Sequence, residues 1–95
     1  MTVHVTETYL DWINQLADRT VRARIQVRVD RLARGNPGQH RNLSGGVSEL
    51  KIDIGPGYRV YYTQRGRELI VLLAGGDKST QDRDIEIAIR LAANL

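Results

Sequence analysis

Apolar and polar residues follow two kinds of spacing along this chain, and each kind predicts a different element. Residues 2–6, 49–54 and 58–63 alternate between apolar or β-branched and polar side chains, which is typical of strands with one buried face. Residues 68–74 are apolar at nearly every position, and such a run indicates a central strand that is covered on both faces. The pattern therefore predicts one strand at the start of the chain and three in its second half.

Helical spacing separates the first strand from the other three. Residues 7–17 place apolar side chains on one face of a helix, for which Thr6 is the predicted N-cap. A second helix is expected to begin after Asp18 or Thr20 and to end before Gly35, forming a hairpin with the first. The apolar stripe of this second helix consists of Val21, Ile25, Val29 and Leu32.

Glycines mark the predicted turns in the second half of the chain. A loop is expected over residues 35–46, a hairpin turn at Gly55-Pro56-Gly57, a two-residue turn at Arg65-Gly66, and the end of the last strand at Gly75-Gly76. One hairpin register places apolar pairs on one face and polar pairs on the other, whereas a slip by one residue would mix the two faces. The predicted pairs are Ile54 with Tyr58, Ile52 with Val60, Leu50 with Tyr62, Asp53 with Arg59, Lys51 with Tyr61 and Glu49 with Thr63.

A last helix should begin near Ser79 or Thr80 and continue to about Ala93. Its predicted inner face consists of Ile85, Ala88, Ile89 and Ala92. The fold class is then α+β, in the order β-α-α-β-β-β-α. An N-terminal strand and a two-helix hairpin pack on an antiparallel sheet that is followed by a C-terminal helix. A chain of 95 residues is expected to form a single domain over residues 1–95.

Composition narrows the possible functions. The chain has no cysteine and only two histidines, His4 and His40, so neither a disulfide framework nor a metal site is expected, and no cofactor is predicted. No apolar run is long enough to span a membrane and the N-terminus lacks the pattern of a signal peptide, so we expect a cytoplasmic protein. Residues 1–48 carry seven arginines and four carboxylates, whereas residues 49–95 carry seven charges of each sign. A basic excess of this kind favours a polyanion or an acidic protein as partner.

The polar face of the predicted hairpin is the first candidate site. Metal-free RNA cleavage needs a base for the 2′-hydroxyl proton, an acid for the leaving oxygen and cations for the charge on phosphate. Arg59 suits the phosphate, Lys51 could act as base, and Tyr61 could stack on a base or donate a proton. An ordinary solvent-exposed polar face explains the same pattern, and spacing alone favours that interpretation.

Two further segments carry candidate chemistry. Gly75-Gly76-Asp77-Lys78-Ser79 joins a strand to a helix, where it could cradle a phosphate and bring Lys78 to the same cleft. Taken alone, the segment is better explained as a tight connection with Ser79 as N-cap. The second helix and the loop after it could contact RNA phosphates, or else an acidic partner, or simply be solvated. The arginines of this basic surface are Arg19, Arg22, Arg24, Arg28, Arg31, Arg34 and Arg41.

Three motifs resemble those of a known family. They are Ser48-Glu49-Leu50-Lys51, Gly55-Pro56-Gly57-Tyr58-Arg59-Val60-Tyr61-Tyr62 and Gly75-Gly76-Asp77-Lys78-Ser79. Together with the order of elements, they resemble the RelE/ParE toxin superfamily, and more narrowly the HigB-like addiction module killer proteins. The resemblance implies a small bacterial toxin that is paired with a cognate antitoxin. RelE and HigB members cut messenger RNA in the ribosomal A site without a metal, whereas ParE members share the fold and poison DNA gyrase.

The resemblance also implies roles for individual residues. Arg59 takes the position of a phosphate-stabilising arginine, Lys51 that of a catalytic lysine, and Lys78 lies near basic residues at the start of the last helix. Asp77 is a candidate because HigB members use varied acidic and basic residues at this end of the sheet, and Tyr61 is the chosen aromatic residue.

The implied function is a metal-independent, ribosome-dependent mRNA endonuclease that inhibits translation. Its partners would be the antitoxin, the ribosome and mRNA, with operator DNA reached only through the antitoxin and no membrane involved. The alternatives are a gyrase inhibitor without catalysis and an inactive toxin that serves as an antitoxin-binding module.

Overall fold

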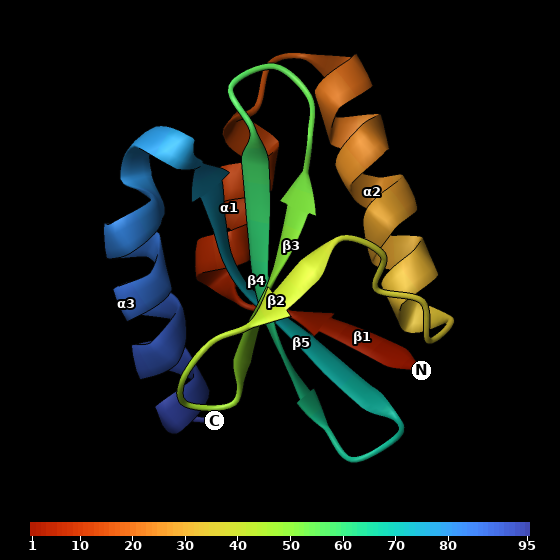
Figure 1. Cartoon of the computed structure of the whole chain (residues 1–95), viewed down its shortest axis with the longest axis vertical. Coiled ribbons are helices and arrows are strands. Elements are labelled where there is room, and N and C mark those ends of the chain that lie inside the picture. The colour runs from red at the N-terminus through yellow and green to blue at the C-terminus, as the bar shows by residue number, and fades with distance from the viewer.

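A five-stranded sheet with helices on both faces forms the protein (Figure 1). The computed structural model describes all 95 residues. The elements are β1 (Thr2–Val5), α1 (Glu7–Gln15), α2 (Arg19–Ala33), β2 (His40–Asn42), β3 (Val47–Ile52), β4 (Tyr58–Arg65), β5 (Leu69–Asp77), the 3₁₀ turn η1 (Lys78–Thr80) and α3 (Gln81–Ala93). The strand order is β1-β5-β4-β3-β2, with β1 parallel to β5 and the other pairs antiparallel. The predicted α+β class is therefore confirmed.

The two faces of the sheet carry separate hydrophobic cores. α1 and α2 cover one face, where apolar side chains of β3, β4 and β5 such as Leu50, Val60 and Ile70 are fully buried. α3 covers the other face, on the side of the sheet opposite α2, and packs Ala88 and Ala92 on β5 (Figure 1). Small alanines let α3 approach the strands closely, so the face of the sheet that it covers is shielded from water.

Both N-terminal helices begin at the predicted caps. The Thr6 hydroxyl accepts a hydrogen bond from the Tyr9 backbone N–H at 3.0 Å, and Asp18 accepts from the N–H groups of Thr20 and Val21. These contacts satisfy N–H groups that have no partner inside the helix. All four residues of the predicted stripe on α2 are buried: Val21, Ile25, Val29 and Leu32.

Strand β2 lies inside the segment that was predicted to be a loop. His40, Arg41 and Asn42 pair with β3 at the edge of the sheet, and all three are exposed. Three polar residues show no apolar alternation, which is why the hydrophobic pattern missed this strand. The Leu43 N–H donates to the Val47 carbonyl at 2.8 Å and closes the hairpin between β2 and β3.

The register of the hairpin between β3 and β4 differs from the prediction by two residues. Ile52 pairs with Tyr58 and Lys51 with Arg59, so the connection covers residues 53–57 instead of 55–57. The backbone turns early because the Ile54 N–H donates to the Ile52 carbonyl and the Gly57 N–H to the Ile54 carbonyl, each at 3.0 Å. A shift by two residues leaves every side chain on its predicted face of the sheet. The predicted cross-strand pairs were therefore wrong, whereas the predicted faces were right.

Two other predicted boundaries also move. The turn after β4 covers residues 66–68, one residue longer than predicted, because Arg65 pairs with Leu69. Gly75 and Gly76 do not end the last strand, since β5 continues through both to Asp77. Each of the helices is too short or too polar to span a bilayer.

Candidate functional site

The candidate site lies on the face of the sheet that α3 covers, near one end of β3 and β4. Lys51 lies directly opposite Arg59, and Glu49 lies directly opposite Tyr61. The expected solvent-exposed polar face is wrong for most of these residues, because Glu49 is 3% exposed, Arg59 6% and Tyr61 0%. Of this group only Lys51, at the end of β3, remains half-buried.

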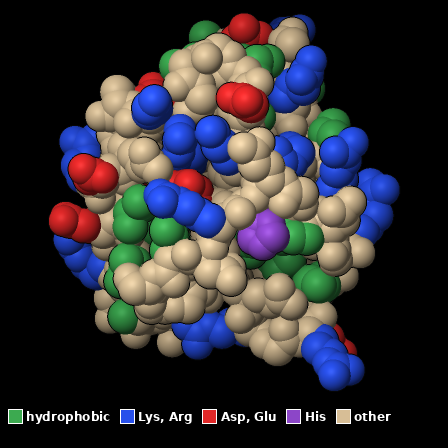
Figure 2. All heavy atoms as spheres, in the orientation of Figure 1, with side chains coloured by type: hydrophobic (Ala, Val, Ile, Leu, Met, Phe, Trp, Pro, Cys, Tyr) green, Lys and Arg blue, Asp and Glu red, His purple; other side chains and the backbone are tan.

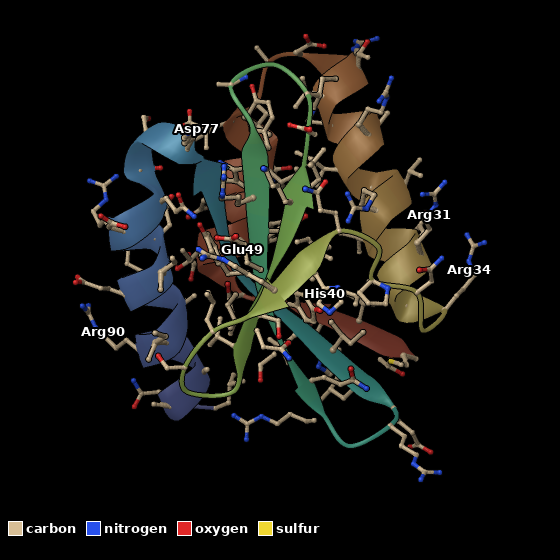
Figure 3. All side chains as sticks on the ribbon, in the orientation of Figure 1. Arg31, Arg34, His40, Glu49, Asp77 and Arg90 are labelled. Carbon is tan, nitrogen blue, oxygen red and sulfur yellow. The ribbon has the colours of Figure 1, made fainter.

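Glu49 is the centre of a polar network in this buried region. One carboxylate oxygen accepts a hydrogen bond from Arg41 Nε at 3.0 Å, and the other accepts from Gln81 Nε2 at 3.1 Å. Arg59 Nε lies 3.7 Å from the second oxygen and forms an ion pair with it. Figure 3 shows Glu49 between the sheet and α3. One carboxylate therefore links the edge strand β2, the central strand β4 and the start of α3.

Arg59 has partners within the protein and very little contact with water. A terminal guanidinium nitrogen donates to the Gly57 carbonyl at 3.0 Å, whereas the buried Nε has no hydrogen-bond partner and interacts with Glu49 through charge alone. An arginine in this state retains donor capacity for a phosphate. In this conformation its observed role is to balance the buried charge of Glu49.

Tyr61 was predicted to stack on a base, and the structure places its ring under α3, where no base can reach it. Its hydroxyl is buried without a well-formed hydrogen bond and lies near the carboxylates of Glu49 and Asp84. Burial, and then the negative charges of Glu49 and Asp84, raise the pKa of Tyr61 well above its ordinary value. The hydroxyl is therefore protonated at neutral pH and can only act as a donor or acceptor of hydrogen bonds.

Asp77 and Lys78 lie where β5 leads into the last helix. Asp77 caps η1 by accepting a hydrogen bond from the Ser79 N–H at 2.8 Å, and its contacts with Ser79 lower the pKa of this carboxyl. Lys78 is exposed. A cavity of about 450 Å³ at this corner is lined only by residues 78–83, so Lys78 does not share it with Lys51 or Arg59. The expected common cleft for these three cations is therefore absent in this conformation.

The two glycines of β5 make room for side chains on both faces of the strand. A Cβ on Gly75 would overlap the ring of Trp12, and a Cβ on Gly76 would overlap the carboxylate of Asp84. Asp84 is buried and accepts a hydrogen bond from the Thr80 hydroxyl at 2.6 Å. The space beside Gly76 is therefore filled by protein, and the phosphate cradle considered for this segment has no room there.

The arginines of the basic surface divide into two kinds. Arg28 is a structural clamp, because its guanidinium donates to the carbonyls of Lys51 at 2.6 Å and of Pro37 and Gln39 at 2.9 Å. Burial, and then the nearby charge of Arg31, lower the pKa of Arg28. Most of the others are free at the surface, and Figure 2 shows blue side chains gathered over α2. Those that are exposed on α2 and at its end are Arg19, Arg24, Arg31 and Arg34, while Arg22 is half-buried.

Sequence reasoning placed Glu49 on the correct face but gave it no role, and it missed Gln81 and Asp84. A carboxylate in the middle of a strand was the available signal, because a buried charge needs partners. Those partners come from β2 and α3, far away along the chain. No group of three or more His, Cys, Asp or Glu side chains is arranged to hold a metal ion.

Comparison with known proteins places the chain in a family. Residues 11–93 match the family model described as "Phage derived protein Gp49-like (DUF891)". A Haemophilus influenzae protein, itself described only as an uncharacterized protein, is 43% identical over 97 aligned positions that cover 100% of this chain and 98% of the relative. The match spans the second half of α1, all of α2, all of β2 to β5, and α3. The chain therefore belongs to the Gp49-like family of phage-derived proteins, a RelE-like, toxin-type family.

Proposed function

We propose that this protein is the toxin of a type II toxin–antitoxin pair, of the HigB-like kind, and that it cuts mRNA on the ribosome without a metal. The observation that supports this most directly is the cross-strand pair of Lys51 and Arg59. Two cations are neighbours on one face at the end of the sheet, next to the segment that carries Asp77 and Lys78. The toxin-type family supports the same assignment.

In this proposal each side chain has a separate task. Lys51 takes the proton of the 2′-hydroxyl, which then attacks the adjacent phosphorus and releases the 5′ oxygen of the next nucleotide. Lys78 donates a proton to that leaving oxygen, and Arg59 stabilises the charge on the phosphate. Asp77 is a carboxylate at neutral pH and its lowered pKa makes it still harder to protonate, so it suits orientation of a lysine better than proton donation. Arg59 is only 6% exposed and Lys78 shares no cavity with Lys51 or Arg59, so joint contact of the three side chains with one phosphate requires the start of α3 to shift.

The basic surface supplies affinity in this proposal. The exposed arginines of α2 bind phosphates of ribosomal RNA or mRNA without reading sequence. The same positive charge suits the antitoxin, which we expect to cover α2 or the start of α3 with an acidic or extended segment in the cytoplasm. Operator DNA is reached only through that partner. A structure of the complex in which both surfaces stay exposed would overturn this part of the proposal.

A protein that binds without cutting is the second candidate, and one observation favours it. Arg59 and Tyr61 are buried and tied into the fold, as expected of structural residues. Such a protein would either inhibit gyrase or serve only to bind the antitoxin.

Induction of the chain in bacterial cells, followed by primer extension on abundant transcripts, separates these functions. The wild-type chain should arrest growth and produce new 5′ ends within minutes. The Lys51→Ala/Lys78→Ala double variant should lower the yield of those ends at least about 100-fold, because it removes both proton-transfer groups. Arg90→Ala, an exposed change on α3, is the control for loss of charge.

Two other outcomes would reject the nuclease, and a third would reject only the residues assigned to catalysis. Intact transcripts with induction of DNA damage signalling would indicate a gyrase inhibitor. Absence of growth arrest would indicate a binding module. Full cutting by the double variant would show that the catalytic residues lie elsewhere. Arg59→Ala is a poor single test, because its loss also removes the charge that balances Glu49.

A further inference from the structure

A second polar cavity lies on the opposite face of the sheet from the candidate catalytic residues. It has a volume of about 330 Å³ and lies between the C-terminal end of α2 and strands β2, β3 and β4. This size is at the lower end of the range for small-molecule pockets. Its polar lining consists of His40, Asn42, Ser48, Tyr62 and Gln64. Figure 2 shows a histidine beside hydrophobic surface, at the position that Figure 3 labels as His40.

Three of these side chains have free hydrogen-bonding atoms after their contacts within the protein are counted. His40 Nδ1 lies 2.8 Å from the Gly38 carbonyl, which can only accept, so Nδ1 carries the proton and Nε2 is left as an acceptor. Asn42 Oδ1 accepts from the Ser48 hydroxyl at 2.9 Å, which leaves the amide NH₂ as a donor. Gln64 Nε2 donates to the Gly66 carbonyl at 3.2 Å, which leaves Oε1 as an acceptor.

The remaining walls are mainly apolar. Leu32 and Pro37 close the side formed by α2 and the following loop, and the buried ring of Tyr62 lies in the sheet. The lining contains no Lys, Arg, Asp or Glu side chain, and the N-terminal ammonium of Met1, another lining residue, donates to the Ala33 carbonyl at 3.1 Å. The cavity therefore suits a flat, uncharged ligand that has both donors and acceptors on its edge, and it offers little to a phosphate or a carboxylate.

Positive charge lies at the same end of α2. Arg31 and Arg34 are exposed and are the chain neighbours of the lining residues Leu32 and Gly35, and Figure 3 shows their side chains extending outward from α2 into solvent. A neutral pocket beside free arginines matches the two parts of a nucleotide, because the base carries edge donors and acceptors and the phosphate carries the charge. We propose that this cavity, the His40 pocket, binds an unstacked base of single-stranded RNA while Arg31 and Arg34 hold the adjacent phosphates. The inference rests on the proposed function, since it takes RNA as the substrate.

NMR titration of the full chain tests this pocket. The probes are AMP, GMP, CMP and UMP, with ribose 5-phosphate as the ligand that lacks a base. The nucleotides should shift the signals of His40 and of the Asn42 and Gln64 side-chain amides in a saturable way that differs among the four bases. Ribose 5-phosphate should shift only signals near Arg31 and Arg34. Equal shifts from ribose 5-phosphate and the nucleotides, or no shift at His40, would overturn the proposal.

Two variants locate the binding. Asn42→Leu removes the free donor and Gln64→Met removes a free acceptor, and both residues are exposed, so the fold should survive, as the dispersion of the NMR spectrum checks. Each variant should weaken nucleotide binding by about three- to tenfold, the effect of one lost hydrogen bond. Glu86→Gln, an exposed change on α3, should bind as the wild type does. Unchanged affinity in both pocket variants would reject an RNA-base site. In a competition experiment, a site from which the antitoxin displaces the nucleotides and single-stranded RNA does not would reject it as well.

The outcome is separable from that of the proposed function. If the chain cuts transcripts but nucleotides leave His40 unperturbed, the pocket inference fails and the nuclease proposal stands. If nucleotides bind at His40 and transcripts stay intact on induction, the pocket stands and the nuclease proposal fails.

Discussion

The ring of Trp12 lies against the backbone of Gly75, so closely that a Cβ at position 75 would overlap it. On the other face of the same strand, the Asp84 carboxylate occupies the corresponding space beside Gly76. Neither glycine has a positive φ, so conformational freedom is not the reason for them. The pair is required because side chains from α1 and α3 pack directly on the backbone of β5 from opposite sides.

Gly75→Ala should therefore lower the free energy of unfolding by about 1–3 kcal/mol, the usual cost of overpacking a well-filled site. Urea unfolding followed by circular dichroism measures this change. In the Trp12→Leu background, the same substitution should cost much less, because the smaller side chain leaves room for the added methyl group. Strictly additive effects of the two changes would contradict the assigned contact.

Arg28 should contribute to stability and not to binding of RNA. Arg28→Met retains much of the apolar stem but leaves the carbonyls of Pro37, Gln39 and Lys51 without their donor. We expect a loss of about 2 kcal/mol in urea unfolding, since hydrogen bonds from a charged donor are worth more than neutral ones.

The matched control for Arg28 is Arg31→Met, three residues along α2. Arg31 is exposed and makes no ion pair or side-chain hydrogen bond, so its replacement should change stability by no more than about 0.5 kcal/mol. RNA affinity should show the opposite order: Arg31→Met should bind RNA more weakly than Arg28→Met does. A stable Arg28→Met variant that loses RNA binding would show that the clamp is not the role of this residue.

The sequence pattern correctly predicted helix caps and buried helix faces, which depend on residues close together along the chain. Asp18 caps α2 and Val29 faces the core because capping and helical periodicity depend only on neighbours along the chain. The faces of β3 and β4 were also correct. The pairing of Lys51 with Arg59 was not predicted, because turn hydrogen bonds within residues 52–57 set the register and no apolar pattern reports them.

The candidate site was predicted less well than the fold, and burial by α3 is the reason. Alternation correctly placed Glu49, Arg59 and Tyr61 on one side of the sheet, but it does not reveal whether a distant helix covers that side. The indication that α3 covers this face lay in the sequence of α3, where the small side chains of Ala88 and Ala92 allow close packing on β5. Polar side chains that are buried between the sheet and α3 need hydrogen-bond partners within the protein, and Gln81 supplies one of them to Glu49.

Asp77 should make stability depend on pH in the acid range. Hydrogen bonds from Ser79 lower the pKa of Asp77 in the folded state, so its contribution is present above the ordinary carboxyl pKa of about 4 and is lost as pH falls through the lowered value. Asp77→Ala should therefore be less stable than wild type at pH 7 by under about 1 kcal/mol, an exposed cap being worth no more.

Urea unfolding at neutral pH and near pH 2 checks this sign, because the difference between Asp77→Ala and wild type should shrink at the lower pH. Ser79→Ala, which removes one of the donors to Asp77, should show part of the same dependence. If the difference in free energy of unfolding between Asp77→Ala and wild type grows as pH falls, the pH dependence comes from a group other than Asp77.

The two arginines on Glu49 should differ sharply in their contributions to stability. The Arg41 side chain is 56% exposed, so its ion pair is screened by water, and Arg41→Ala should cost at most about 1 kcal/mol. The Arg59 side chain is 8% exposed and Glu49 4%, so Arg59→Met leaves a buried carboxylate with less compensation. We expect a loss of about 2–3 kcal/mol, toward the lower range for breaking a buried pair, because Arg41 and Gln81 still donate to Glu49.

Glu49→Gln completes this comparison. It leaves the buried Arg59 guanidinium without its ion-pair partner and with only the more distant charge of Asp77, so it should cost at least as much as Arg59→Met, about 3 kcal/mol. The double variant Glu49→Gln/Arg59→Met removes both charges and should be more stable than the sum of the single effects predicts, which urea unfolding of all four proteins measures. Equal losses for Arg41→Ala and Arg59→Met would mean that the buried ion pair between β3 and β4 contributes no more to stability than the exposed pair of Arg41 with Glu49.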